Sequence, residues 1–256
     1  MLFDEIIFGP IHSRRLGNSL GINLLPTKKK LCNFDCVYCE CGWNEDTKDI
    51  SALLPQKKDI EKELRDKLIQ FKDNNTIIDS ITFSGNGEPT LHPEFSQIID
   101  MVVELRNHYA PEAQISVLSN ATNLLKEDIF KALQKIDNPI LKLDAATPKM
   151  FYAISKANPK VISFEKVKEK LILFGKDAIV QTLLLRGEND GQKLDNTTHE
   201  EFEAWLKVVK EVNPKMVMLY AIDRVTPESN LEKLSKDELE VFAQKVRAIG
   251  IETNTY

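Results

Sequence analysis

Residues 80–103 read SITFSGNGEPTLHPEFSQIIDMVV, a short apolar run followed by a glycine-containing turn and a longer amphipathic stretch. The run Ser80–Ser84 has the length and apolar content of a buried strand. After the turn, apolar residues recur at helical spacing around Ile98 and Val102, and Pro93 stands where that helix would begin. The stretch therefore predicts one strand–turn–helix unit.

The same unit recurs along the whole chain. Further strand-like runs are Ser19–Leu25, Ile115–Leu118, Ile140–Leu143, Ala178–Leu185 and Met216–Ile222. Helical patterns cover residues 57–72, 94–107, 126–136, 163–174, 198–212 and 235–249. Strands that alternate with helices form a parallel sheet with right-handed crossovers. The sequence thus predicts an α/β fold, either an open doubly wound sheet or an incomplete barrel.

The bulk properties describe a globular chain of 256 residues with a net charge of −5. No apolar run approaches the roughly 20 residues of a membrane span, and the N-terminus lacks the features of a signal peptide. We therefore expect a cytoplasmic monomer that makes no membrane contact. We also expect a single domain over 1–256, with an N-terminal extension (1–19), core strands (20–222) and a C-terminal loop, helix and tail (223–256).

The chain's four cysteines all lie between positions 32 and 41, and three of them have the spacing Cys32-x3-Cys36-x2-Cys39. Thiolates are the usual ligands of iron–sulfur clusters. Three cysteines on one loop can hold three corners of a [4Fe–4S] cubane and leave one iron open to a small molecule. The alternative is a structural zinc site that also uses Cys41, although zinc ligands usually come as pairs on separate segments.

This cysteine loop resembles the signature of the radical S-adenosylmethionine (SAM) superfamily. The resemblance implies that SAM binds the open iron and that one electron, supplied by a flavodoxin or ferredoxin, cleaves it to a 5′-deoxyadenosyl radical. It also implies that Tyr38, the aromatic residue before Cys39, lies near the adenine of SAM. On this reading Cys32, Cys36 and Cys39 are the metal ligands.

The turn Gly85–Pro89 contains Glu88, whose carboxylate would repel a phosphate. The turn therefore suits an ammonium group better than a phosphate. It resembles the GGEP motif of the superfamily, with Asn86 in place of the second glycine. The resemblance implies that the turn binds the amino group of SAM. The implied contacts are Gly85, Asn86, Gly87, Glu88 and Pro89.

Other polar residues follow the later strands. The resemblance implies SAM contacts for Ser119, Asn120, Gln181 and Arg186, although turn, cap and surface roles are alternatives. Lys142 and Asp144 share one face of their strand, so they form either a mutual ion pair or a substrate-binding, catalytic pair. Active sites of barrels lie at the carboxyl ends of the strands, and this pattern favours a (βα)6 partial TIM barrel.

Three further segments, FGPIHSRRLGNSLGINLLP (8–26), LKLDAATP (141–148) and YAIDRVTPESNLEKLS (220–235), resemble the wyosine-synthase group, which modifies a tRNA base. Those enzymes carry a second cluster, but no cysteine precedes Cys32 here, so one cluster is expected. They also use a lysine to form a Schiff base with pyruvate, a role open to Lys142.

Alternatives to a tRNA substrate remain open. A glycyl-radical-enzyme activase has a similar length and cluster loop, and a zinc-binding adaptor would not be an enzyme at all. The basic residues Arg14, Arg15 and Lys28–Lys30 form either a solvated surface or a contact for RNA phosphates. The four histidines show no metal-ligand spacing.

Overall fold

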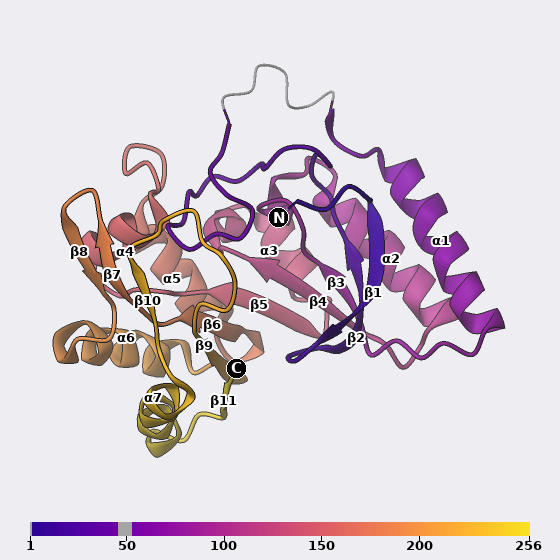
Figure 1. The fold of residues 1–256 in the computed structure, drawn as a ribbon. Helices are drawn as coiled ribbons and strands as arrows, with labels where there is room; N and C mark the ends of the chain where they lie inside the picture. Colours follow the sequence, from indigo (N-terminus) through magenta and orange to yellow (C-terminus); the bar gives the residue numbers. More distant parts are fainter. Residues whose placement is uncertain (1, 46–52) are drawn as a thin grey trace. The chain divides into compact units, whose positions relative to one another are not determined.

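A computed structural model describes residues 2–45 and 53–256 (Figure 1). Residue 1 of the expected N-terminal extension lies outside this part of the chain. The contacts divide the protein into two compact units. The first unit comprises Met1–Cys32, Asn44–Ser119 and Lys126–Pro139, and the second comprises Asn33–Trp43, Asn120–Leu125 and Ile140–Tyr256.

The first unit contains four neighbouring strands: β1 (Ile7–Ser13), β2 (Gly17–Ile22), β3 (Ser80–Phe83) and β4 (Gln114–Ser119). β1 is antiparallel to β2, whereas β2, β3 and β4 are parallel, with Ser80 paired to Ser19 on one side and Gln114 on the other. Its helices are α1 (Lys57–Asp73), the 3₁₀ helix η2 (Pro89–Leu91), α2 (Phe95–Tyr109) and α3 (Glu127–Leu133). Figure 1 shows α1 and α2 side by side.

The second unit contains β5 (Asn138–Lys142, from Ile140 onward), β6 (Ile179–Leu183), β9 (Met216–Tyr220) and β11 (Thr253–Thr255), all parallel. A small antiparallel sheet has the order β10 (Leu231–Lys233), β7 (Leu185–Asn189), β8 (Gln192–Asp195). Its helices are η3 (Thr122–Leu125), α4 (Pro148–Ser155), α5 (Phe164–Phe174), η4 (Gly175–Asp177), α6 (His199–Val212) and α7 (Lys236–Ala248).

The helices of the second unit begin where the sequence offers a cap. The side chains of Thr147, Ser163, Thr198 and Ser235 each accept a hydrogen bond from a backbone N–H in the first turn of α4, α5, α6 and α7. At Ser235 the side chain of Glu238 completes a capping box. Each cap satisfies an N–H group in the first helical turn, which fixes where the segments after β5, α4, β8 and β10 end.

All six predicted strands and all six predicted helices are present, with small shifts at their ends. The sequence analysis missed β1, α4, β11 and the small sheet. β1 contains Pro10, whose missing N–H is tolerated because the strand lies at an edge. Among residues 2–45 and 53–256, no helix combines the length and apolar character of a membrane span.

Candidate functional site

The turn after β3 pairs with the residue that precedes Cys32. Leu31 N–H donates to the Asn86 carbonyl (2.8 Å), and Glu88 N–H donates to the Leu31 carbonyl (3.0 Å). A Cβ on Gly87 would lie 1.9 Å from the Leu31 oxygen, and the φ angle of Gly87 is +140°. Only glycine allows this approach. The start of the cysteine motif is therefore held against the predicted SAM-binding turn.

Gly85 allows a second close approach, to Asn23, which follows β2. A Cβ on Gly85 would lie 2.6 Å from Asn23 Oδ1, which accepts hydrogen bonds from the N–H groups of Leu25 and Asn86 (both 3.2 Å). Asn23 is fully buried, and its Nδ2 has no hydrogen-bond partner among the described residues. Sequence reasoning missed Asn23, although it is a polar residue at the carboxyl end of a strand.

Asn86, predicted to contact SAM, uses its side chain within the protein. Its Oδ1 accepts from Phe3 N–H (2.8 Å), and its Nδ2 donates to the carbonyls of Phe3 (2.7 Å) and Pro26 (2.8 Å). These bonds use the acceptor and both N–H donors of the amide. The side chain therefore fastens the N-terminal segment to the turn. The backbone groups of Asn86 are also bonded within the protein, the N–H to Asn23 Oδ1 and the carbonyl to Leu31 N–H.

Glu88 and Ser119, from the ends of β3 and β4, are brought together. Glu88 is only 2% exposed, and its Oε1 accepts hydrogen bonds from Ser119 Oγ (2.8 Å), Thr90 N–H (3.2 Å) and the Thr90 hydroxyl. Pro89 opens η2, where its missing N–H costs nothing. The carboxylate predicted to meet an ammonium group is thus fixed in one orientation.

The cysteine loop of the second unit rests on the end of α4. Asp35 N–H donates to the Ser155 carbonyl (2.8 Å) and Val37 N–H to the Ile154 carbonyl (3.0 Å). Within the loop, Cys39 N–H donates to the Cys36 carbonyl (3.0 Å). Helix α4, which sequence analysis did not predict, is therefore the support of the segment that carries two of the three motif cysteines.

Asn120 also contacts the cysteine motif. Its Nδ2 donates to Asn33 Oδ1 (2.7 Å), and its own Oδ1 accepts from the N–H and hydroxyl of Thr122 (3.1 and 2.7 Å). Asn33 Nδ2 donates in turn to the Thr122 hydroxyl (2.7 Å). This closed set of bonds orients the residue that follows Cys32.

None of the four cysteines forms a disulfide, and each is buried or half-buried. Over the described ranges, 2–45 and 53–256, no group of three or more His, Cys, Asp or Glu side chains converges as ligands of a single metal ion. The basic residues nearby differ in exposure: Lys30 is buried, and Lys29 pairs with Glu45 at 3.8 Å.

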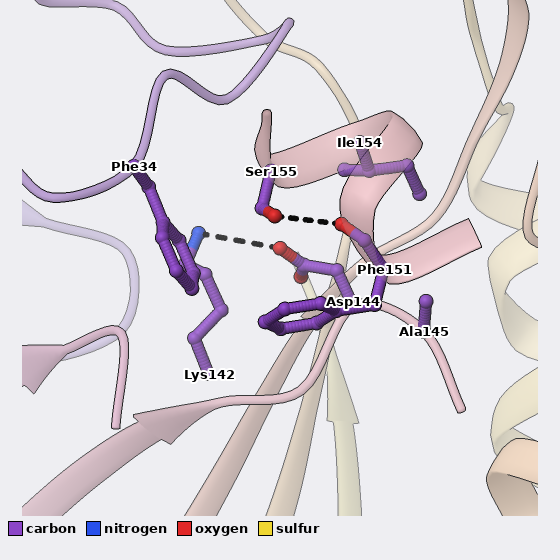
Figure 2. Close-up of a pocket in the computed structure, with 7 residues that line it drawn as sticks. All are labelled: Phe34, Lys142, Asp144, Ala145, Phe151, Ile154 and Ser155. Atoms are coloured by element: carbon purple, nitrogen blue, oxygen red, sulfur yellow. Dashed lines mark hydrogen bonds and ion pairs between the residues drawn. The ribbon is translucent and has the colours of Figure 1, made fainter. Parts of the chain in front are cut away.

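Tyr38 is buried and belongs to a hydrogen-bonded group with the half-buried side chains of Lys142, Asp144 and Tyr220. The Tyr38 hydroxyl donates to Asp144 Oδ2, while Lys142 Nζ donates to the hydroxyls of Tyr38 (2.7 Å) and Tyr220 (2.8 Å). Lys142 Nζ and Asp144 Oδ2 are 3.9 Å apart, and Figure 2 marks this ion pair with a dashed line. Asp144 Oδ1 accepts from Leu183 N–H (2.9 Å). The mutual ion pair, one of the two expected roles of Lys142 and Asp144, is thus present.

A small pocket lies beside this ion pair. Its apolar lining comes from Phe34 of the cysteine loop and from Ala145, Phe151 and Ile154, and Ser155 completes it (Figure 2). The Phe34 and Phe151 rings meet edge to face, with centroids 5.5 Å apart. The ammonium and carboxylate therefore lie in surroundings of low polarity, which strengthens their interaction.

The protonation states of Lys142 and Tyr38 follow from these contacts. Burial alone lowers the pKa of the Lys142 ammonium, but the charges of Asp144, Tyr220 and Cys36 outweigh it, and the pKa is raised. Burial, followed by the Asp144 carboxylate, raises the pKa of the Tyr38 phenol. At neutral pH this group of side chains therefore contains a protonated Lys142 ammonium and a neutral Tyr38 phenol.

The other two predicted SAM contacts have different surroundings. Gln181 is paired in register with Lys142, is 5% exposed, and has no partner for its Nε2 within the described part of the chain. Arg186 lies on β7 instead, where it donates to Thr197 (2.9 Å) and Glu238 (2.6 Å). The Arg186 hydrogen bond, with those from Ser235, lowers the pKa of Glu238 to about 2. Arg186 therefore fastens α7 to the small sheet.

Residues 30–199 match the protein family described as the Radical SAM superfamily. The chain belongs to this superfamily. Members of this superfamily are enzymes that use a [4Fe–4S] cluster, SAM and an external one-electron donor.

The radical SAM chain has several curated relatives. It is 32% identical over 238 residues to GTPase Obg of Brachyspira hyodysenteriae, covering 91% of this chain but only 32% of that protein. It is 33% identical over 241 residues to a UPF0026 protein of Helicobacter pylori strain J99, covering 91% and 71% of the two chains. A UPF0026 protein of Methanocaldococcus jannaschii is 30% identical over 218 residues, covering 84% and 62%.

Solved structures identify the fold. A radical SAM methyltransferase from Sphaerobacter thermophilus has a TM-score of 0.67 at 13% identity, covering 93% of this chain and 65% of that one. TYW1 with a lysine–pyruvate adduct bound has a TM-score of 0.56 at 15% identity, covering 90% and 73%. At such identities the likeness concerns the fold alone. It confirms the predicted partial TIM barrel and excludes the open doubly wound sheet.

Proposed function

We propose that Cys32, Cys36 and Cys39 hold one [4Fe–4S] cluster and that the turn Gly85–Pro89 binds SAM beside it. The observation that carries this proposal is the pairing of Leu31 with Gly87, because it joins the residue before Cys32 to the middle of the turn. When bound, the two groups supply a 5′-deoxyadenosyl radical, which starts hydrogen abstraction. The side chains around the two groups bind and orient them.

The residues present fit both groups. Three thiols at this spacing are suitable cluster ligands that leave a fourth corner open. The Glu88 carboxylate suits an ammonium group. The Nδ2 of buried Asn23, next to Gly85, has no partner within residues 2–45 and 53–256 and is a donor for an acceptor atom of a ligand. We therefore assign Glu88 to the SAM amino group, with Ser119 and Thr90 orienting its carboxylate.

The proposed substrate is a tRNA base. The resemblance of three segments to wyosine synthases supports it. The basic residues that precede Cys32, of which Lys28 is exposed and Lys29 half-exposed, offer charge for phosphates. A flavodoxin or ferredoxin of the cytoplasm is the proposed electron donor.

The tRNA proposal is tested with anaerobically reconstituted protein, SAM, dithionite, pyruvate and unmodified tRNA. We expect methionine and 5′-deoxyadenosine to form in all reactions with SAM, and a new nucleoside mass to appear only when tRNA is present. Cys36→Ala protein is the control, and it should give neither product. SAM cleavage without any new nucleoside mass would reject the tRNA substrate and leave the radical SAM assignment intact.

A further inference from the structure

Lys142 places a half-buried positive charge beside the cysteine loop. The proposed function assigns no role to this charge. Its Nζ lies 2.7 Å from the hydroxyl of Tyr38 and 4.6 Å from the centroid of the Tyr38 ring. Tyr38 stands between Cys36 and Cys39 in the sequence. Because the lysine side chain is only 20% exposed, water screens its charge poorly.

The opposite charge, Asp144, is held in place by the fold. Leu183 N–H and the Tyr38 hydroxyl each bond one of its oxygens, and Asn196 Nδ2 donates to its backbone carbonyl (2.8 Å). Buried Glu201 then accepts hydrogen bonds from the N–H groups of Ala146 (2.7 Å) and Thr147 (3.1 Å) in the following loop. The ammonium and the carboxylate therefore keep fixed positions relative to Tyr38.

These charges lie against the segment that carries two proposed ligands of the cluster. Tyr38, which is hydrogen-bonded to both Lys142 and Asp144, is the residue before Cys39 and the second residue after Cys36. Because Cys39 N–H donates to the Cys36 carbonyl (3.0 Å) and Val37 N–H to the Ile154 carbonyl (3.0 Å), the backbone around Tyr38 is fixed as well. Net charge and nearby hydrogen bonds are among the factors that set the reduction potential of an iron–sulfur cluster.

We propose that Lys142 and Asp144 form an opposed pair of fixed charges that sets the reduction potential of the cluster, Lys142 raising it and Asp144 lowering it. The inference rests on the proposed cluster at Cys32, Cys36 and Cys39. In the step concerned, [4Fe–4S]²⁺ takes one electron and becomes [4Fe–4S]¹⁺, while the flavodoxin or ferredoxin donor loses it. The added negative charge is stabilised by the ammonium and destabilised by the carboxylate, so both residues act as positioning residues rather than catalytic ones.

The two side chains should therefore have effects of opposite sign. In Lys142→Met the equilibrium constant for reduction of the cluster should become at least tenfold smaller. For one electron this corresponds to a fall of about 59 mV in the midpoint potential. In Asp144→Asn it should rise. Lys142→Arg, which keeps the positive charge, should stay within a threefold change of the equilibrium constant. A role in folding alone gives no reason for opposite signs.

The measurement is a redox titration of each reconstituted variant without SAM. The electron paramagnetic resonance signal of the reduced cluster monitors the titration. Iron content per chain is determined in parallel. Shifts of the same sign in Lys142→Met and Asp144→Asn, or no shift beyond twofold in either, would overturn the inference. If Lys142→Met fails to take up a cluster, Asp144→Asn decides: a rise supports the inference, and no change or a fall overturns it.

Failure of this inference is distinguishable from failure of the proposed function. A wild-type protein that binds no cluster would reject both. A wild-type protein with a cluster that cleaves SAM, combined with variants of unchanged potential, would reject only the role of the charge pair.

Discussion

Cys36→Ala is expected to reduce SAM cleavage to background while the protein remains folded. Cys36 is the central cysteine of the motif, and its removal leaves two thiolates for a cubane that needs three from this loop. Its neighbours are held by backbone bonds from Asp35 and Val37 to α4, which the substitution leaves in place. The measurements are iron content after anaerobic reconstitution, formation of 5′-deoxyadenosine under dithionite, and circular dichroism.

Cys41→Ala is the matched control. Cys41 is half-buried on the same loop but stands outside the Cys32-x3-Cys36-x2-Cys39 spacing. We expect this variant to keep its iron and its SAM cleavage. If it loses the metal to the same extent as Cys36→Ala, all four cysteines are ligands, and the open-corner cluster is the wrong description of the site.

Gly87→Ala is expected to have the second large effect, on stability and on SAM binding together. The new Cβ would stand 1.9 Å from the Leu31 carbonyl oxygen, and the backbone of Gly87 is in a conformation that other residues rarely adopt. Strain and overpacking of this kind cost about 2–4 kcal/mol in combination. Because the pairing with Leu31 must open, the turn should also lose affinity for SAM. Urea unfolding and equilibrium binding of SAM measure the two effects.

Gly42→Ala separates backbone strain from the close approach. Gly42 also has a positive φ (+81°), but no atom lies within 4 Å of the position of its Cβ. It should therefore cost only about 1–2 kcal/mol, the penalty of a left-handed conformation. Equal losses in the two variants would show that the contact between Gly87 and Leu31 contributes nothing of its own.

The repeating strand–helix units were predictable because each is long enough to show a period. Six amphipathic stretches of eleven residues or more predicted the helices, and short apolar runs predicted the strands between them. The missed elements lack that signal. β11 has three residues, α4 has eight, and the Gly9–Pro10 pair in β1 is more typical of a turn.

The candidate site was predictable only where a motif lies in one segment. The cysteine spacing and the turn Gly85–Pro89 could be recognised in the sequence, whereas the Asn86 bonds to Phe3 span 83 positions and the Tyr38 bond to Asp144 spans 106. No local pattern encodes such partners. Asn86 and Arg186 were therefore expected at the cofactor, although their side chains are hydrogen-bonded within the protein.

The proposed function leaves one iron of the cubane without a side-chain ligand and assigns SAM to that iron. The most direct test is the electron paramagnetic resonance spectrum of the reduced, reconstituted wild-type cluster, recorded before and after SAM is added. A change in the g values on addition of SAM is the predicted result. A spectrum of the intact cluster that SAM leaves unchanged would contradict the assignment.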